Sequence, residues 1–401
     1  MVTKAGGSPW RGLAGWFGRH EALSAAWPLL LFTRLPVLLV GYVAVLTIGF
    51  AVPLDWQVSS DPLLNLLARW DTGWYLTIAR DGYGWSGRTD IEQNIVFFPA
   101  YPLLMRAAGE LLGGRLLLGG LAVSLASFLG AMAYMYGLAR RQVDRETAIA
   151  ALALLACYPY AVFYSAVYTE SLFLLCMTGA LYHFGRTEWL RAGGWGLLAG
   201  LARPNGFVLS LPLACMALAP LLSGVGPGLR WFVTGREDRA EGGVRRVLEG
   251  LAAAAMPGVG LLVFLAFNYW LTGDPFTWMR AVAAWGRSIP GAGPFAGALS
   301  VAPRTPQDMC NAAAVLFAAV MIIPVTWRFG APYGLLTVVA LAPSFLSGGL
   351  ESIGRYTSVV FPLFLGLAAV TGPRARLALI IVFAVLQALA AVMFFTWRSM
   401  Y

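Results

Sequence analysis

The segment "AWPLLLFTRLPVLLVGYVAVLTIGFAV", residues 26–52, sets the fold class of this 401-residue chain. It is longer than the roughly 20 apolar residues that a transmembrane helix needs, and Arg34 is its single charged residue. Similar runs recur along the chain, which is 59% hydrophobic and 12% charged. The pattern predicts an all-α polytopic membrane protein rather than a soluble protein with one anchor.

The hydropathy pattern predicts about eleven spans in one membrane domain, residues 1–401. The first run is too long for a signal-peptide core, and the basic segment before it predicts a cytoplasmic N-terminus. If the spans alternate from that start, all of the net charge of +9 except Arg34 falls on the cytoplasmic side, including the loop 223–247. Arg34 itself is expected to snorkel to the cytoplasmic headgroups. The predicted spans are 26–52, 115–139, 147–168, 171–185, 193–203, 207–222, 248–271, 309–327, 331–348, 356–371 and 377–397.

Several function classes lack their usual sequence signals. No basic stripe with interleaved aromatic residues indicates a nucleic-acid partner, and no glycine-rich loop of the nucleotide-binding type occurs. The two histidines, His20 and His183, lie far apart in the sequence, which argues against a histidine metal site or a Ser-His-Asp triad. The four cysteines fall in or beside apolar runs without paired spacing, so no disulfide framework is expected.

Two long segments on the predicted outer side, 53–114 and 272–308, are candidate functional regions. In the first, the spacing of Leu67, Trp70, Trp74 and Ile78 predicts one stripe of an interfacial helix. The run "NIVFFPAYPLLMRAAGELL", residues 94–112, predicts a second helix at the interface, with Arg106 and Glu110 paired one turn apart. Pro99 and Pro102, on either side of Tyr101, break this run before it becomes a clean span.

Asp71, in "RWDTGWYLTIARDGY" at residues 69–83, is the first candidate for catalysis. On a helix it projects about 100° from Trp70, at the edge of the apolar stripe. A partly desolvated carboxylate among aromatic rings suits a general base that takes a proton from a sugar hydroxyl. An N-cap role for Asp71 explains the same pattern, and the sequence pattern alone does not separate the two interpretations.

Charged residues also occur where the outer ends of spans are predicted. Glu170, in "YTESLF", is costly at membrane depth unless it faces a cavity or a cation. Arg203, followed by Pro204 and Asn205, indicates a broken helix lining a polar cavity. Arg355 could anchor to headgroups or bind a phosphate through two hydrogen bonds. The tyrosines near Glu170 are interpreted as an aromatic belt, with sugar stacking as the alternative; they are Tyr158, Tyr160, Tyr164 and Tyr168.

Five segments in this order resemble the PIG-V family of membrane mannosyltransferases. They are "RWDTGWYLTIARDGY" (69–83), "FFPAYPLLMR" (97–106), "VYTESLFLL" (167–175), "LARPNGF" (201–207) and "GRYTSVVFPLF" (354–364). The first and third are specific, and the other three are individually weak. The resemblance covers residues from about 34 to 365.

The resemblance implies a GT-C glycosyltransferase, with helices parallel to the membrane in the first outer segment and an active site on the extracytoplasmic side. It implies a polyprenyl-phosphate sugar as donor, mannose as the sugar, and a glycolipid or glycan hydroxyl as acceptor. Asp71 becomes the general base, and displacement in one step inverts the anomeric configuration. Arg203 and Arg355 are expected at the donor phosphate. The remaining expected substrate contacts are Glu170, Asn205, Tyr101, Trp70 and Trp74.

Two features separate this chain from the eukaryotic members of that family. Lys4 is the single lysine among 28 basic residues, which is typical of a GC-rich prokaryotic genome and predicts the plasma membrane as its location. The acceptor is therefore left open. The chain has no Asp-x-Asp motif, only "DIE" at 90–92, so we expect neither a metal nor another cofactor. The alternatives are a GT-C enzyme for another lipid-linked sugar and a transporter or flippase of such a lipid.

Overall fold

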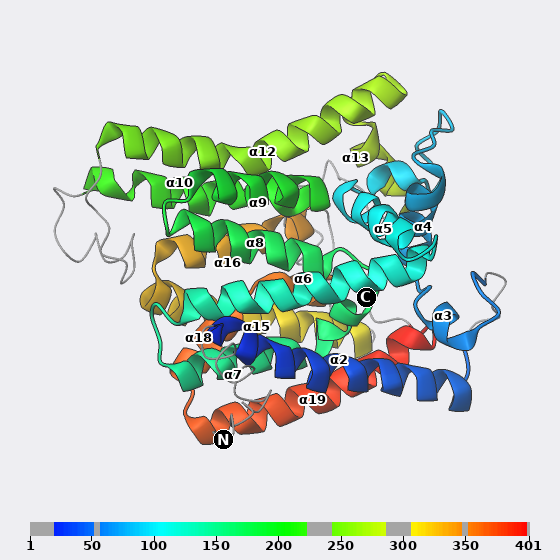
Figure 1. Cartoon of the computed structure of the whole chain (residues 1–401), viewed down its shortest axis with the longest axis horizontal. Coiled ribbons are helices and arrows are strands. Elements are labelled where there is room, and N and C mark those ends of the chain that lie inside the picture. The colour runs from blue at the N-terminus through cyan, green and yellow to red at the C-terminus, as the bar shows by residue number, and fades with distance from the viewer. Residues whose placement is uncertain (1–19, 52–56, 223–242, 286–305, 347–351, 399–401) are drawn as a thin grey trace, which may run out of the picture.

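The computed structural model describes residues 20–51, 57–222, 243–285, 306–346 and 352–398. Every regular element within these ranges is a helix, which confirms the all-α prediction for them. The long helices lie side by side, and their ends gather at two opposite ends of the molecule (Figure 1). This arrangement, with the apolar helices described next, is that of a polytopic membrane protein.

Among the described residues, six helical stretches are long and apolar enough to cross a membrane. Each of the other predicted runs also overlaps a helix or a bent helix pair, and counting each bent pair as one span raises the number to eight. The total of eleven stays a prediction. The six stretches are α2 (Glu21–Thr47), α6 (Leu116–Ala139), Pro204–Leu221, α12 (Val244–Thr272), α15 (Pro306–Phe329) and α19 (Pro373–Phe395). Pro204–Leu221 comprises η3 (Pro204–Leu209), α10 (Ser210–Leu218) and part of η4 (Ala219–Leu222), and the shorter helices are α8 (Glu170–Phe184), α9 (Trp189–Ala202) and α16 (Ala331–Leu346).

Two predicted spans are bent pairs of helices. α7 (Arg145–Cys157) meets η2 (Pro159–Ser165) at 80°, and α17 (Ile353–Val359) meets α18 (Pro362–Val370) at 74°. In both, the second helix begins at a proline, which lacks the backbone N–H that would continue the hydrogen bonding of the preceding helix. The bends bring η2 and α17 together, and the Tyr164 hydroxyl donates to the Ser358 carbonyl at 2.7 Å.

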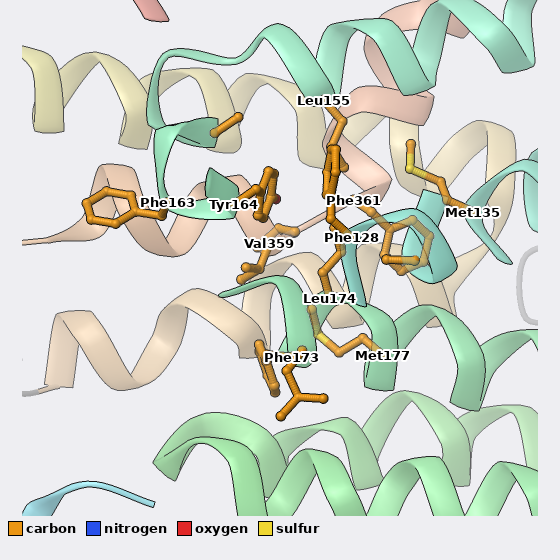
Figure 2. Packing of buried hydrophobic residues seen from close by; sticks show 14 of the residues in the cluster. Phe128, Met135, Leu155, Phe163, Tyr164, Phe173, Leu174, Met177, Val359 and Phe361 are labelled. Atoms are coloured by element: carbon orange, nitrogen blue, oxygen red, sulfur yellow. The ribbon is translucent and has the colours of Figure 1, made fainter. Parts of the chain in front are cut away.

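Aromatic and aliphatic side chains fill the space between α6, α8 and the two bends. Tyr164, Val359, Phe128 and Leu174 lie close together in Figure 2. The rings of Phe128 and Tyr164 are stacked with their centroids 4.6 Å apart. The aromatic-belt interpretation of the tyrosines near Glu170 is therefore wrong, because all four are between 0% and 6% exposed and belong to the core; they are Tyr158, Tyr160, Tyr164 and Tyr168.

Short helices from both long outer segments lie at one end of the molecule, on the right of Figure 1, which we call the loop end. The first segment supplies α3 (Pro62–Leu66), α4 (Thr72–Asp81), η1 (Asn94–Val96) and α5 (Ala100–Leu111), and the second supplies α13 (Thr277–Ala281) and η5 (Val282–Trp285). Parts of the predicted loops lie outside the described residues, namely 53–56 of 53–114, 223–242 of 223–247, and 286–305 of 272–308.

The predicted apolar stripe of the first outer segment is not formed on one helix. α3 ends at Leu66 and α4 begins at Thr72, and Trp70 between them has a φ of 50°. A left-handed residue interrupts a right-handed helix, so Leu67 and Trp70 do not share a face with Trp74. The predicted pairing of Arg106 and Glu110 is confirmed. Both residues lie on α5, and Arg106 Nε is 3.0 Å from Glu110 Oε1.

Arg34 does not snorkel to the headgroups. It lies about 20 Å along α2 from the first residue of that helix and is 1% exposed. Its guanidinium donates to the carbonyls of Ala156 and Ala161 and, at 3.3 Å, to the side-chain oxygen of Gln387. Arg34 therefore satisfies the carbonyl groups freed where α7 breaks.

Candidate active site

Four charged side chains from distant parts of the sequence form a continuous chain of ion pairs near the loop end. Arg355 Nη1 donates to Asp71 Oδ2 at 2.8 Å. Arg355 Nε also donates to Glu170 Oε1. The same oxygen accepts a hydrogen bond of 2.6 Å from Arg203 Nη1. The order is thus Asp71, Arg355, Glu170, Arg203, with two negative and two positive charges.

The start of α4 is held in place by the segment that precedes α8. The Asp71 N–H donates to the Tyr168 hydroxyl at 3.1 Å, and the Thr72 hydroxyl donates to the Val167 carbonyl at 3.4 Å. Asp71 occupies the N-cap position of α4, but its carboxylate makes no capping hydrogen bond and binds Arg355 instead. An N-cap role therefore accounts for the position of Asp71 and not for its side chain.

Glu170 links the two arginines. It is the first residue of α8 and is 0% exposed, and its Oε1 accepts from both Arg203 and Arg355. Within the described residues, its other oxygen, Oε2, has no hydrogen-bond partner. A carboxylate buried this deeply is destabilising unless cations compensate for it, so Glu170 and the arginines depend on one another.

Aromatic rings cover the two guanidinium groups. Arg355 lies 4.6 Å from the centroid of the Tyr168 ring and 5.1 Å from that of Phe163. Arg203 lies 4.9 Å from the centroid of Tyr356. Sequence reasoning did not assign these cation–π contacts, although Tyr168 and Tyr356 stand beside the charged residues in the quoted segments. The negative face of each ring stabilises the buried cation.

The four charged side chains differ in their exposure. Asp71 is 26% exposed, whereas Arg355 is 8%, Arg203 6% and Glu170 0% exposed. Of the four ion-paired side chains, Asp71 is therefore the one that an incoming molecule reaches first. A carboxylate accessible from one side and bound to a guanidinium from the other can accept a proton while the cation faces a leaving anion.

The other predicted site residues lie around this cluster in different settings. Trp74 is half-buried and stacks on Phe97 at 5.9 Å, with Trp285 of the second outer segment 5.8 Å away. Trp70 packs against Trp397, with 4.7 Å between centroids. These two tryptophans therefore join the first outer segment to other parts of the loop end.

Tyr101 and Asn205 are buried rather than open to a substrate. Tyr101 is 0% exposed, and its hydroxyl bonds to the Gly120 carbonyl at 2.9 Å and to the Ser124 hydroxyl at 2.8 Å. Its ring packs edge-on against Tyr75 of α4, so Tyr101 helps to hold α4 in place. Asn205 donates weakly to the Ala340 carbonyl at 3.4 Å. Neither contact supports the predicted substrate-binding role.

Within the ranges that the structure covers, no three histidine, cysteine, aspartate or glutamate side chains come together as metal ligands. The two carboxylates of the cluster, Asp71 and Glu170, are both bound to Arg355.

Residues 45–221 match the model of a protein family described as mannosyltransferase (PIG-V). Over 164 residues the chain is 37% identical to GPI alpha-1,6-mannosyltransferase 2 of Rattus norvegicus, covering 37% of this chain and 31% of that protein. The protein of the same name from Mus musculus is also 37% identical over 164 residues, which are 36% of this chain and 30% of the relative. The matched part thus spans about a third of the length of these relatives.

Among solved structures, the fold is similar to the archaeal oligosaccharyltransferase AglB from Archaeoglobus fulgidus in complex with an inhibitory peptide and a dolichol-phosphate. The TM-score is 0.42 at 16% identity, covering 96% of this chain and 56% of the other. A crystal structure of the oligosaccharyltransferase of that organism, tethered to an acceptor peptide, gives a TM-score of 0.45 at the same identity and coverage.

Proposed function

We propose that the protein is a GT-C transferase that moves mannose from a polyprenyl-phosphate-mannose donor, because residues 45–221 match the model of the mannosyltransferase (PIG-V) family. The acceptor is a hydroxyl of a glycolipid or glycan. The family match includes Asp71, Glu170 and Arg203, and Arg355 joins them through the ion pairs described above.

The Asp71–Arg355 ion pair carries the proposal. It places a partly exposed carboxylate next to a buried guanidinium, which are the two groups that a direct displacement needs. Asp71 takes the proton of the acceptor hydroxyl, and the acceptor oxygen forms a bond to the anomeric carbon. The bond from that carbon to the phosphate oxygen breaks, and its electron pair leaves with the polyprenyl phosphate. One displacement inverts the configuration, so a β-linked donor gives an α-mannoside.

Arg355 stabilises the phosphate while negative charge develops on it. A guanidinium has five N–H donors, so Arg355 can keep its bond to Glu170 while it binds a phosphate oxygen in place of Asp71. Glu170 and Arg203 are positioning residues in this scheme, because Glu170 ties Arg355 to Arg203 from the buried side. Trp74 and Trp70 are the candidate surfaces for the sugar, since both are partly exposed at the same end as Asp71.

We place the site on the extracytoplasmic side of a prokaryotic plasma membrane. The distribution of basic residues predicts that the loop end faces outwards. A lipid-linked donor agrees with this side, because nucleotide sugars are cytoplasmic while a polyprenyl chain keeps the donor in the bilayer.

Transfer of labelled mannose from a short-chain polyprenyl-phosphate-mannose to the lipid fraction of source membranes tests the proposal. We expect transfer by the purified wild type and a loss of about a thousandfold in Asp71→Asn. Asp81→Asn is the matched control, because Asp81 ends the same helix and forms an ion pair with Arg80 at the surface. Unchanged transfer by Asp71→Asn contradicts the role of the base, and retention of the donor's configuration contradicts the displacement.

If the wild type transfers another lipid-linked sugar but not mannose, the donor carries that other sugar and the displacement chemistry is unchanged. If no sugar becomes covalently attached to any acceptor, while labelled lipid crosses the bilayer of a vesicle, the protein is a transporter and the proposal fails.

A further inference from the structure

An open groove with a volume of about 460 Å³ lies between α6, α8 and α9, away from the active site. Its lining residues are Tyr134, His183, Arg191, Gly194, Trp195 and Leu198. Glu170 begins α8 and His183 is the second-last residue of that helix, so the groove and the ion-pair cluster are about 20 Å apart along α8. The groove therefore belongs to the end of the molecule opposite the loop end.

The end of the groove nearest the start of α9 is polar and positively charged. Glu188 accepts from His183 at 2.5 Å, from Arg186 at 2.8 Å and from Arg191 at 3.0 Å. Hydrogen bonds from Arg186 and His183 lower the pKa of Glu188 to about 2.

Among the described residues at this position, Glu188 is thus bound to two guanidinium groups, those of Arg186 and Arg191, and to His183. The surplus of positive charge favours an anion next to Arg191, whose side chain is 69% exposed.

The inner part of the groove is apolar and open. Gly194 is exposed, and a Cβ atom built on it would meet no atom within 4 Å. Trp195 and Leu198 are partly exposed beside it. Leu198 follows Arg191 by seven residues, so the groove runs about 10 Å along α9 from a cation to aliphatic carbon. That length matches the step from a headgroup to the first part of an acyl chain.

We propose that this groove binds one anionic phospholipid, with its phosphate at Arg191 and Tyr134 and an acyl chain over Gly194 against Trp195 and Leu198. Charge complementarity at one end and exposed apolar carbon at the other select this occupant. The ends of α8 and α9 place the polar residues where headgroups lie if these helices cross the bilayer. The site does not depend on the proposed transfer reaction, and its occupant is distinct from a donor bound at the loop end.

Native mass spectrometry of the purified protein, titrated with dioleoylphosphatidylglycerol or dioleoylphosphatidylcholine, tests this site. We expect one phosphatidylglycerol to bind more tightly than phosphatidylcholine. Gly194→Leu fills the groove and should remove this binding, whereas Gly194→Ala adds a single methyl group and should keep it. Arg191→Ala should weaken phosphatidylglycerol about fivefold, which is the contribution of one basic residue near an anionic headgroup.

Arg245→Ala is the control for charge, because Arg245 is 92% exposed, is bound to Glu249 and lies in the first turn of α12, a helix that contributes no residue to the lining of the groove. It should leave the tight site unchanged. The proposal is overturned if Gly194→Leu binds phosphatidylglycerol as tightly as wild type does. It is also overturned if Arg191→Ala and Arg245→Ala lose the same amount of affinity. Displacement of the lipid by inorganic phosphate at equal concentration would also overturn it, because the site would then recognise the anion alone.

Discussion

Glu170→Gln removes one negative charge from a cluster of two carboxylates and two guanidiniums while it keeps the shape of the side chain. The amide oxygen can still accept a hydrogen bond from Arg203 or Arg355. The cluster nevertheless acquires a net positive charge at a position that is 0% exposed. Arg355 keeps Asp71 as a counter-ion, but Arg203 loses the carboxylate of Glu170, with which it forms an ion pair.

The expected cost follows from burial. Removing one partner of a buried ion pair destabilises a protein by about 3–5 kcal/mol, because the remaining charge is left without compensation. Asp71→Asn is the comparison, since Asp71 is 26% exposed and its loss leaves Arg355 bound to Glu170. An ion pair at that exposure contributes about 1 kcal/mol or less. Glu170→Gln should therefore affect stability more than Asp71→Asn, and Asp71→Asn should affect transfer more.

Unfolding in mixed micelles of detergent and SDS measures both variants under the same conditions. The double variant Glu170→Gln with Arg203→Gln restores neutrality and should cost less than the sum of the two single changes by about 1–3 kcal/mol. A stability for Glu170→Gln within about 0.5 kcal/mol of wild type, the range of ordinary surface substitutions, would refute the argument that the cluster depends on this carboxylate.

Three further outcomes are expected. Arg355→Lys keeps the charge but cannot hold two carboxylates through a rigid fork, so the kcat/KM of mannose transfer should fall by about 10–100-fold; an unchanged value would contradict the role of the guanidinium. Arg34→Met leaves buried carbonyl oxygens without a donor and should lower the free energy of unfolding by about 3 kcal/mol or more, whereas a neutral effect in the same SDS assay would show that water replaces Arg34. Glu188 has a lowered pKa in the folded state, so its stabilising effect is present above its usual pKa of 4.5 and is lost as the pH falls towards 2. The midpoint temperature of thermal unfolding should therefore depend on pH more strongly in wild type than in Glu188→Gln between pH 4.5 and about 2. Identical profiles would contradict the stabilising role of the Glu188 carboxylate.

The sequence predicted the helices well because hydropathy is a local property. Each predicted span overlaps a helix or a bent pair, and Asp71, Glu170, Arg203 and Arg355 were selected as charges that an apolar chain does not place without a reason. It could not predict that these four bind one another. The contacts join residues up to 284 positions apart, and they form only after α8, α17 and the start of α4 have packed.

Two wrong predictions share a cause, which is that each was made from its own segment without the contacts of that segment to the rest of the chain. Arg34 was expected near the headgroups, but α2 begins earlier, at Glu21, and the broken end of α7 offers carbonyl oxygens in the interior. The stripe through Trp70 assumed a continuous helix, but Trp70 takes a left-handed conformation. Hydrophobic spacing carries no signal for either event, since both depend on contacts with another segment.

The ion-pair cluster also bears on the order of events in the proposed reaction. With two carboxylates and two guanidiniums the cluster is neutral, so it does not attract an anion by net charge. A donor phosphate must compete with Asp71 for Arg355, because Glu170 holds the same guanidinium from the buried side. When the phosphate takes that position, Asp71 loses its hydrogen bond from Arg355, and its Oδ2 can then accept the proton of an acceptor hydroxyl. In the proposed reaction the donor therefore binds first, because only then is Oδ2 of Asp71 released from Arg355 while an anomeric carbon is present for the acceptor oxygen to attack.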